Sequence, residues 1–216
     1  MEIKRHPARP ALGILISASI AVLAGCGPTG AFLAATLPDT EKVPPEFNRL
    51  PGRTVLIHVY ALPEIRWAYE KVSLDVAAYL ADHLARHVKG VNIVDVVRVS
   101  SYMEKTPGSE NDPVGVGKHF NAEMVIEVSV YKLSVRDPGM AHFYRGRMAA
   151  SVVVYDLTRP NEPPERIPLG DVEVAVPEEG PVGLTGVTAV QVRQQTYLAF
   201  ATQVGRKFHE YERPIE

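Results

Sequence analysis

The chain has 216 residues, with 23 Lys and Arg against 25 Asp and Glu, for a formal net charge of −2. This balance gives no electrostatic basis for binding nucleic acid or anionic lipid headgroups. An apolar content of 46% is ordinary for a globular domain and too high for a disordered chain. With one cysteine, no disulfide can form within the chain, so the core alone must stabilise it.

The first 25 residues predict a secretory signal peptide. Lys4, Arg5 and Arg9 precede an apolar run that starts at Ala11 and ends just before Cys26. That run is shorter than the ~20 residues of a membrane-spanning helix. Two alternatives are an uncleaved membrane anchor and an ordinary signal with a chance cysteine.

Leu23, Ala24, Gly25 and Cys26 resemble the lipobox of bacterial lipoproteins. The resemblance implies a diacylglyceryl group on the Cys26 sulfur, cleavage before Cys26, and a fatty acid such as palmitate on the new amino group. Two or three acyl chains make a stable anchor where one does not. We expect the protein to be anchored by Cys26 to the cell membrane or outer membrane and to face the periplasm or exterior. Gly27 differs from the aspartate of the enteric inner-membrane retention signal, which favours the outer membrane.

Residues 26–52 contain many Pro and Gly residues and predict a flexible tether. A strand is expected at 54–60, a long helix at 63–88 and a second strand at 91–99. Such a strand–helix–strand unit predicts a parallel crossover. Short helices are expected at 100–105 and 113–120, where Asp112 and Pro113 favour a helix start.

Alternating apolar and polar residues predict antiparallel strands at 122–135 and 142–157 and a third strand at 166–176. A closing helix is expected at 187–209. These elements predict one α/β domain over residues 53–211, followed by a tail at 212–216. Its mixed sheet of about five strands would follow the order strand, helix, strand, helix, strand, strand, strand, helix.

No signature of catalysis, metal binding or cofactor binding stands out. His83 and His87 have helical i, i+4 spacing, but Leu84 replaces the Glu of the metalloprotease motif and no third ligand is indicated, so they are interpreted as flanking helix residues. Gly115 to Lys118 lack the spacing of a phosphate-binding loop and are interpreted as a small-residue helix turn. His58 is expected to be a packed, hydrogen-bonded core histidine. We therefore expect no enzyme activity, no metal and no cofactor.

One face of the predicted hairpin could bind a partner. Tyr and Arg are enriched at binding hot spots, and strand alternation turns them away from the core here. Two alternatives are a solvated face with cross-strand pairs and a face covered by the closing helix. The candidate residues are Glu127, Ser129, Tyr131, Arg147, Ser151 and Tyr155.

The element order, the phrase Val116 to Ile126 and the phrase Val152 to Leu157 resemble anticodon-binding-like α/β modules of envelope proteins. These include the periplasmic domain of curli-secretion lipoproteins, lipoprotein activators of peptidoglycan synthases, and the amino-terminal domain of the Tol-system propeller protein. Glu123 stands where the family usually has Asp. The resemblance implies packing positions and no active site.

The sequence thus favours a lipid-anchored, non-enzymatic module that binds an envelope protein during envelope assembly or secretion. The alternatives are a lipoprotein that binds a small ligand or lipid, which would show a large apolar cavity, and an envelope hydrolase. The partner's identity, the membrane and the oligomeric state stay open.

Overall fold

The computed structural model describes residues 40–136, 143–183 and 187–215, so the predicted signal peptide and Cys26 lie outside the described residues. The chain forms two compact units, which are described separately: a small one that includes residues 40–42 and 212–215, and a larger one from Val43 to Tyr211. In the small unit, β1 (Thr40–Val43) pairs with β8 (Tyr211–Pro214). An ion pair joins Arg213 to Glu41. Residues 212–214, expected to be part of a tail, therefore belong to a strand.

The larger unit is built on a mixed sheet with the strand order β3-β2-β4-β5-β6, and β7 pairs with β5. β2 runs parallel to β3 and to β4, whereas β4, β5 and β6 pair antiparallel. The predicted mixed α/β sheet, its parallel crossover and its hairpin are confirmed. The strands are β2 (Thr54–Ala61), β3 (Asn92–Ile93), β4 (Met124–Arg136), β5 (Phe143–Asp156), β6 (Glu165–Val176) and β7 (Val182–Gly183).

The helices differ from the predicted ones mainly at their ends. The helix expected at 63–88 is two helices, and the strand expected at 91–99 stops after two residues. Asp95 ends it, because its carboxylate accepts hydrogen bonds from the amides of Val97 and Arg98 and so begins α4. The helices are α2 (Pro63–Ala68), α3 (Val72–His87), α4 (Val96–Lys105), the 3₁₀ turn η1 (Ser109–Asn111), α5 (Pro113–His119) and α6 (Ala189–Arg206).

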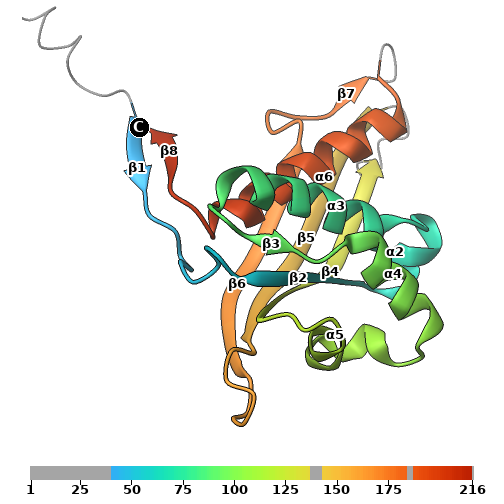
Figure 1. Ribbon diagram of the computed structural model, residues 1–216. Helices are drawn as coiled ribbons and strands as arrows, with labels where there is room; N and C mark the ends of the chain where they lie inside the picture. The colour runs from blue at the N-terminus through green and yellow to red at the C-terminus, as the bar shows by residue number, and fades with distance from the viewer. Residues whose placement is uncertain (1–39, 137–142, 184–186, 216) are drawn as a thin grey trace, which may run out of the picture. The chain divides into compact units, whose positions relative to one another are not determined.

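The main core lies between the sheet and the helix pair α3 and α6, which lie side by side in Figure 1. Strands β4, β5 and β6 turn alternate apolar side chains toward these helices. On the helix side, Leu80, Leu84, Phe200 and Val204 are fully buried. The inward strand residues are Met124, Ile126, Val128, Val130, Met148, Ala150, Val152, Val154, Val172 and Val174.

A smaller core lies on the opposite face of the sheet. Leu56 of β2 and Val125 of β4 pack there against Val99 of α4 and Val116 of α5. Gly117 of α5 approaches this face so closely that a Cβ would clash with Val125. The stretch from Gly115 to Lys118 is therefore a close-packed helix turn, as predicted.

The folded unit begins about ten residues earlier than the sequence predicted. Phe47 and Leu50, assigned to the tether, are buried in the main core, and the Phe47 amide donates to the Lys207 carbonyl at 2.9 Å. The Phe47 ring also meets Phe208 edge-on. The neighbouring prolines exclude a regular helix or strand, but they do not prevent single side chains from being buried. The proline pattern therefore did not predict the burial of Phe47 and Leu50.

β6 forms an irregular edge of the sheet. Pro168 lies within it, Gly170 has a φ of +78°, and the register with β5 shifts between Val152 and Val153. A left-handed residue of this kind favours glycine.

Candidate functional site

The sheet face formed by β4, β5 and β6 opposite α3 and α6 is uncovered over much of its area. α6 packs on the other face, against Met148, Val152 and Val174, so the closing helix does not cover the predicted surface. α4, η1 and α5 cover the end near Leu56, His58 and Val125. At the far end Tyr131 is 45% exposed. We call this surface the outer face.

All six predicted residues lie on the outer face, as the strand pairing shows. Ser129 of β4 is directly opposite Ser151 of β5, and Val125 is opposite Tyr155. A register shift at Tyr131 then brings Ser134 opposite Arg147. Among the six, Tyr131 is exposed, whereas Glu127, Ser129, Arg147, Ser151 and Tyr155 are half-buried.

Tyr155 contributes to packing and is less exposed than its position in the alternating pattern predicted. Its ring packs against the small core, and its hydroxyl donates to Glu127 at 3.0 Å. Ser129 donates to the other oxygen of Glu127 at 3.4 Å. Burial raises the pKa of Tyr155, and the Glu127 carboxylate raises it further. This end of the outer face is thus held in place by its own hydrogen bonds.

At the Tyr131 end, β6 supplies charged residues that the sequence prediction did not include. Lys132 pairs with Glu173 at 2.7 Å, and this contact lowers the Glu173 pKa. The Tyr131 hydroxyl donates a hydrogen bond to the Asp171 carboxylate. Desolvation and this carboxylate raise the pKa of Tyr131. Asp171 and Glu173 alternate with the buried Val172 and Val174, so the period-two pattern of β6 could have identified them.

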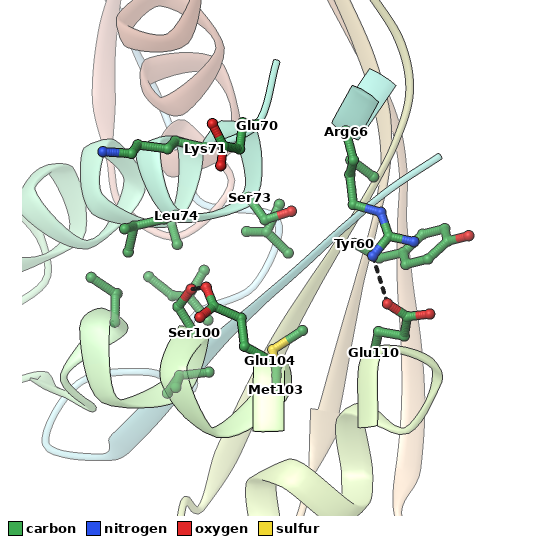
Figure 2. Close-up of a pocket in the computed structure, with 16 residues that line it drawn as sticks. Tyr60, Arg66, Glu70, Lys71, Ser73, Leu74, Ser100, Met103, Glu104 and Glu110 are labelled. Carbon is green, nitrogen blue, oxygen red and sulfur yellow. Dashed lines mark hydrogen bonds and ion pairs between the residues drawn. The ribbon is translucent and has the colours of Figure 1, made fainter. Parts of the chain in front are cut away.

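A cavity of about 340 Å³ lies between α3 and α4, along β2 (Figure 2). Within the described chain, no strand pairs with this side of β2 beyond Val55. Arg66 bonds to Glu110 at 2.6 Å at the cavity wall. Trp67, the next residue of α2, is 89% exposed, and sequence periodicity did not single it out. The other charged lining residues are Glu70, Lys71 and Glu104.

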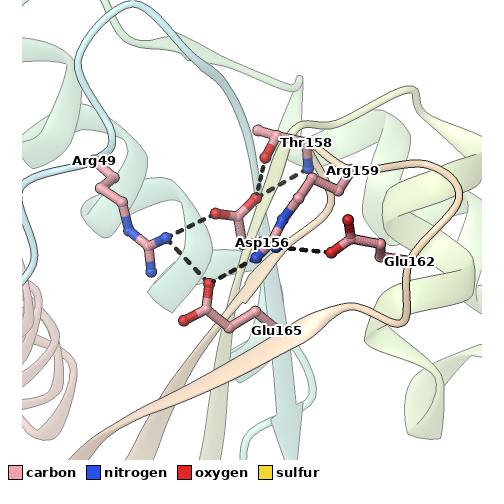
Figure 3. A network of polar contacts seen from close by, with 6 residues as sticks. All are labelled: Arg49, Asp156, Thr158, Arg159, Glu162 and Glu165. Atoms are coloured by element: carbon pink, nitrogen blue, oxygen red, sulfur yellow. Dashed lines mark hydrogen bonds and ion pairs between the residues drawn. The ribbon is translucent and has the colours of Figure 1, made fainter.

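Figure 3 shows a polar network that joins the segment before β2 to the β5–β6 hairpin. Arg49 donates to Asp156 at 3.0 Å and to Glu165 at 3.1 Å. Burial would raise the pKa of Asp156, but hydrogen bonds from Thr158 and the charge of Arg49 lower it. Asp156 belongs to one of the phrases that carried the family resemblance. Its role here is to hold a turn together.

His58 is fully buried and its Nε2 donates to the Ser109 carbonyl at 3.1 Å, which confirms the prediction of a packed core histidine. Burial lowers its pKa. It lies under η1 on the outer side of the sheet, directly opposite Glu127 in the β2–β4 pairing.

His83 and His87, interpreted from the sequence as flanking helix residues, are joined by a third imidazole, His209, which follows α6. One ligand atom from each of the three lies within 4.8 Å of the others. Burial, the two neighbouring imidazoles and Arg206 lower the His83 pKa to about 4, although Asp82 opposes this shift. His83 is therefore neutral near pH 7. No sequence pattern indicated His209, because its approach to α3 is a tertiary contact across more than a hundred residues.

No helix in residues 40–136, 143–183 and 187–215 is long and apolar enough to cross a membrane. Leu23, Ala24, Gly25 and Cys26 lie outside these residues.

No protein-family model matches the chain, and no curated protein matches it in sequence. Solved structures of similar fold include the PelC dodecamer from Paraburkholderia phytofirmans, which is 8% identical with a TM-score of 0.45 and aligns over 79% of this chain and 98% of its own. Lipoprotein GNA1162 from Neisseria meningitidis is 11% identical, with a TM-score of 0.40 and coverages of 71% and 96%. The LpoB C-terminal domain from Salmonella enterica is 12% identical, with a TM-score of 0.29 and coverages of 58% and 83%. Bacterial lipoproteins are thus among the structural neighbours. At these TM-scores the similarities carry no functional argument.

Proposed function

We propose that this protein is a lipid-anchored component of the bacterial cell envelope that binds another envelope protein and catalyses no reaction. Cys26 would carry the anchor, and the outer face would be the binding surface. The observation that supports this surface is that α3 and α6 both pack on the opposite side of the sheet, which leaves Tyr131 exposed beside charged residues of both signs.

The composition of the outer face suits a protein partner. An aromatic side chain with a polar end contributes contact area with little loss of conformational entropy, and Tyr131 has this character. Lys132 and Glu173 are exposed and can exchange their mutual contact for contacts with a partner. Because the β4–β5 ladder holds the backbone rigid, little ordering is needed on binding.

The alternatives have weaker support. A lipid-binding protein needs a large apolar cavity. The cavity along β2 has an apolar lining that includes Leu74, Val96 and Val99, but it holds only about 340 Å³, is partly open and has Arg66, Glu70, Lys71, Glu104 and Glu110 at its walls. A small ligand with both apolar and charged groups would fit it. A hydrolase with an activated serine needs a base beside the hydroxyl. Ser100 and Ser129 donate to the carboxylates of Glu104 and Glu127, and Ser109 donates to a carbonyl oxygen; among the described residues no serine hydroxyl is hydrogen-bonded to a histidine.

Site-specific crosslinking in living cells tests the proposal. The photoreactive p-benzoylphenylalanine would replace Tyr131 in the full chain, and Leu198 in a control. Leu198 is 52% exposed on α6, which packs on the opposite side of the sheet. We expect one discrete crosslinked product from position 131 and none from position 198, with the trapped protein identified by mass spectrometry.

Two alanine variants complete the test. Tyr131→Ala and Arg147→Ala should reduce capture of the identified partner at least tenfold while leaving the unfolding midpoint nearly unchanged, and Leu198→Ala should change neither. Equal crosslinking from both positions, or a large loss of stability with intact capture, would contradict the assignment of the outer face.

A further inference from the structure

Three histidines from two distant parts of the chain meet at one end of the main core. His83 and His87 lie one turn apart on α3, and His209 follows α6. The ring centroids of His83 and His87 are 4.2 Å apart, those of His87 and His209 are 4.7 Å apart, and those of His83 and His209 are 5.2 Å apart. We call this group the histidine cluster.

Backbone carbonyls fix the proton positions on two of these rings. Nδ1 of His87 lies 2.8 Å from the His83 carbonyl, and Nδ1 of His209 lies 2.7 Å from the Glu210 carbonyl. A carbonyl can only accept, so each Nδ1 carries the proton and each neutral ring has its lone pair on Nε2. Metal-binding histidines usually make such a second hydrogen bond, because it orients the ring and fixes the tautomer.

The separation of the nitrogens is close to that of a metal site. Nε2 of His83 lies 3.0 Å from Nε2 of His209. Two nitrogens bound to one tetrahedral Zn²⁺ at 2.0–2.1 Å lie roughly 3.4 Å apart. Because His209 has its lone pair on Nε2, this contact is a hydrogen bond donated by His83 Nε2, and metal binding would move that proton to Nδ1 of His83. The third ligand atom is within 4.8 Å of the other two, and rotation of the stacked rings would turn the three lone pairs toward one point.

The chain also makes room for the cluster. Gly205 of α6 is buried against the His83 imidazole, and a Cβ there would clash with the ring. Glycine inside a helix is about 0.5–1 kcal/mol less favourable than alanine, so its presence needs a packing reason. The close approach of His83 to α6 supplies that reason.

We propose that His83, His87 and His209 form a binding site for a divalent transition metal, Zn²⁺ in the first place, with each Nε2 as a ligand and a fourth position open on the exposed His87 side. Three imidazoles and one open position are a common zinc ligand set. The ion would join α3 to the segment after α6 and stabilise their contact. The affinity of a given imidazole site for divalent first-row metals increases from Mn²⁺ through Ni²⁺ to Cu²⁺, so the site would bind Ni²⁺ and Cu²⁺ as well.

Calorimetric titration of the full chain with ZnCl₂ tests this proposal. The protein would be purified in detergent without a polyhistidine tag and treated with EDTA beforehand. We expect one Zn²⁺ per chain with micromolar or tighter affinity, and a rise of several degrees in the unfolding midpoint. Co²⁺ in place of Zn²⁺ should give the visible absorption of a four- or five-coordinate nitrogen site.

The variants His87→Gln and His209→Gln each remove one ligand and should weaken Zn²⁺ binding at least tenfold. His87 is exposed, so His87→Gln should fold normally even if the more buried His209 tolerates replacement poorly. His119→Gln is the matched control, because His119 is an exposed histidine that stacks on Tyr102 outside the cluster. Absence of saturable binding up to about 100 µM Zn²⁺, or parental affinity in His87→Gln, would overturn the proposal.

Discussion

The His83 imidazole occupies the space that a side chain at position 205 would fill. Because residue 205 is glycine, α3 and α6 can approach each other closely at this point. This contact is a stability determinant whether or not a metal is bound.

We expect Gly205→Ala to destabilise the protein by about 1–3 kcal/mol, because overpacking at a buried contact costs more than the gain in helix propensity. Chemical denaturation measures the effect. The His83→Ala background is the control, because removing the imidazole removes the clash. There, Gly205→Ala should be neutral or stabilising. An equal loss in both backgrounds would show that the contact with His83 is not the cause.

Stability should fall as the pH is lowered from about 6.5 to about 4. The folded-state pKa of His83 is lowered to about 4, so the unfolded chain binds a proton in this range that the folded chain does not. The groups that face His83 are His87, His209, Arg206 and Asp82. The measurement is the free energy of unfolding against pH in EDTA.

His83→Gln should show a shallower slope over the same pH range. Some slope should persist in this variant, because burial also lowers the pKa of His58. Identical slopes in the parent and in His83→Gln would contradict the assignment to His83.

A chain that begins at residue 53 should be less stable than one that begins at residue 43. The shorter chain lacks Phe47 and Leu50, and removing a single buried Leu side chain costs about 2–5 kcal/mol. We expect the longer version to unfold in one cooperative transition at higher denaturant. Leu50→Ala in the longer version should reproduce a large part of the difference. Equal unfolding midpoints for the two versions would show that residues 43–52 do not stabilise the fold and belong to the tether.

Cys26→Ser should give an unprocessed precursor that incorporates no radiolabelled palmitate, because the thioether that precedes cleavage cannot form. Membrane fractionation should then show loss of the lipid-dependent association. Ser73→Ala, a substitution in the folded part of the chain, serves as the control and should be processed and labelled like the parent. Equal labelling of Cys26→Ser and the parent would contradict lipid anchoring.

The parts of the fold that follow from local pattern could be predicted. Met124 to Val130 alternate, so their faces follow from the period of a strand, and the hairpin partner follows from the next alternating run. Asp112 accepts from the Gly115 amide, as the predicted helix start at Pro113 requires.

What depends on tertiary contact could not be predicted. His209 lies far from α3 in sequence, and Tyr155 follows the outward pattern but is half-buried because the small core extends beneath it. The burial of Phe47 likewise depends on its contacts with Lys207 and Phe208 at the end of α6 and not on its own neighbours in sequence.

The irregular edge at β6 limits how copies of this protein can associate. Continuing a sheet from one molecule into the next requires an edge strand with a regular row of free amides and carbonyls. Pro168 has no amide hydrogen, and the left-handed Gly170 with its register shift bends the strand. Exposed charges at Arg166, Asp171 and Glu173 add further opposition to a second strand. Any self-assembly at this side must therefore use side chains and shape, and the edge protects the protein from open-ended, fibre-like growth.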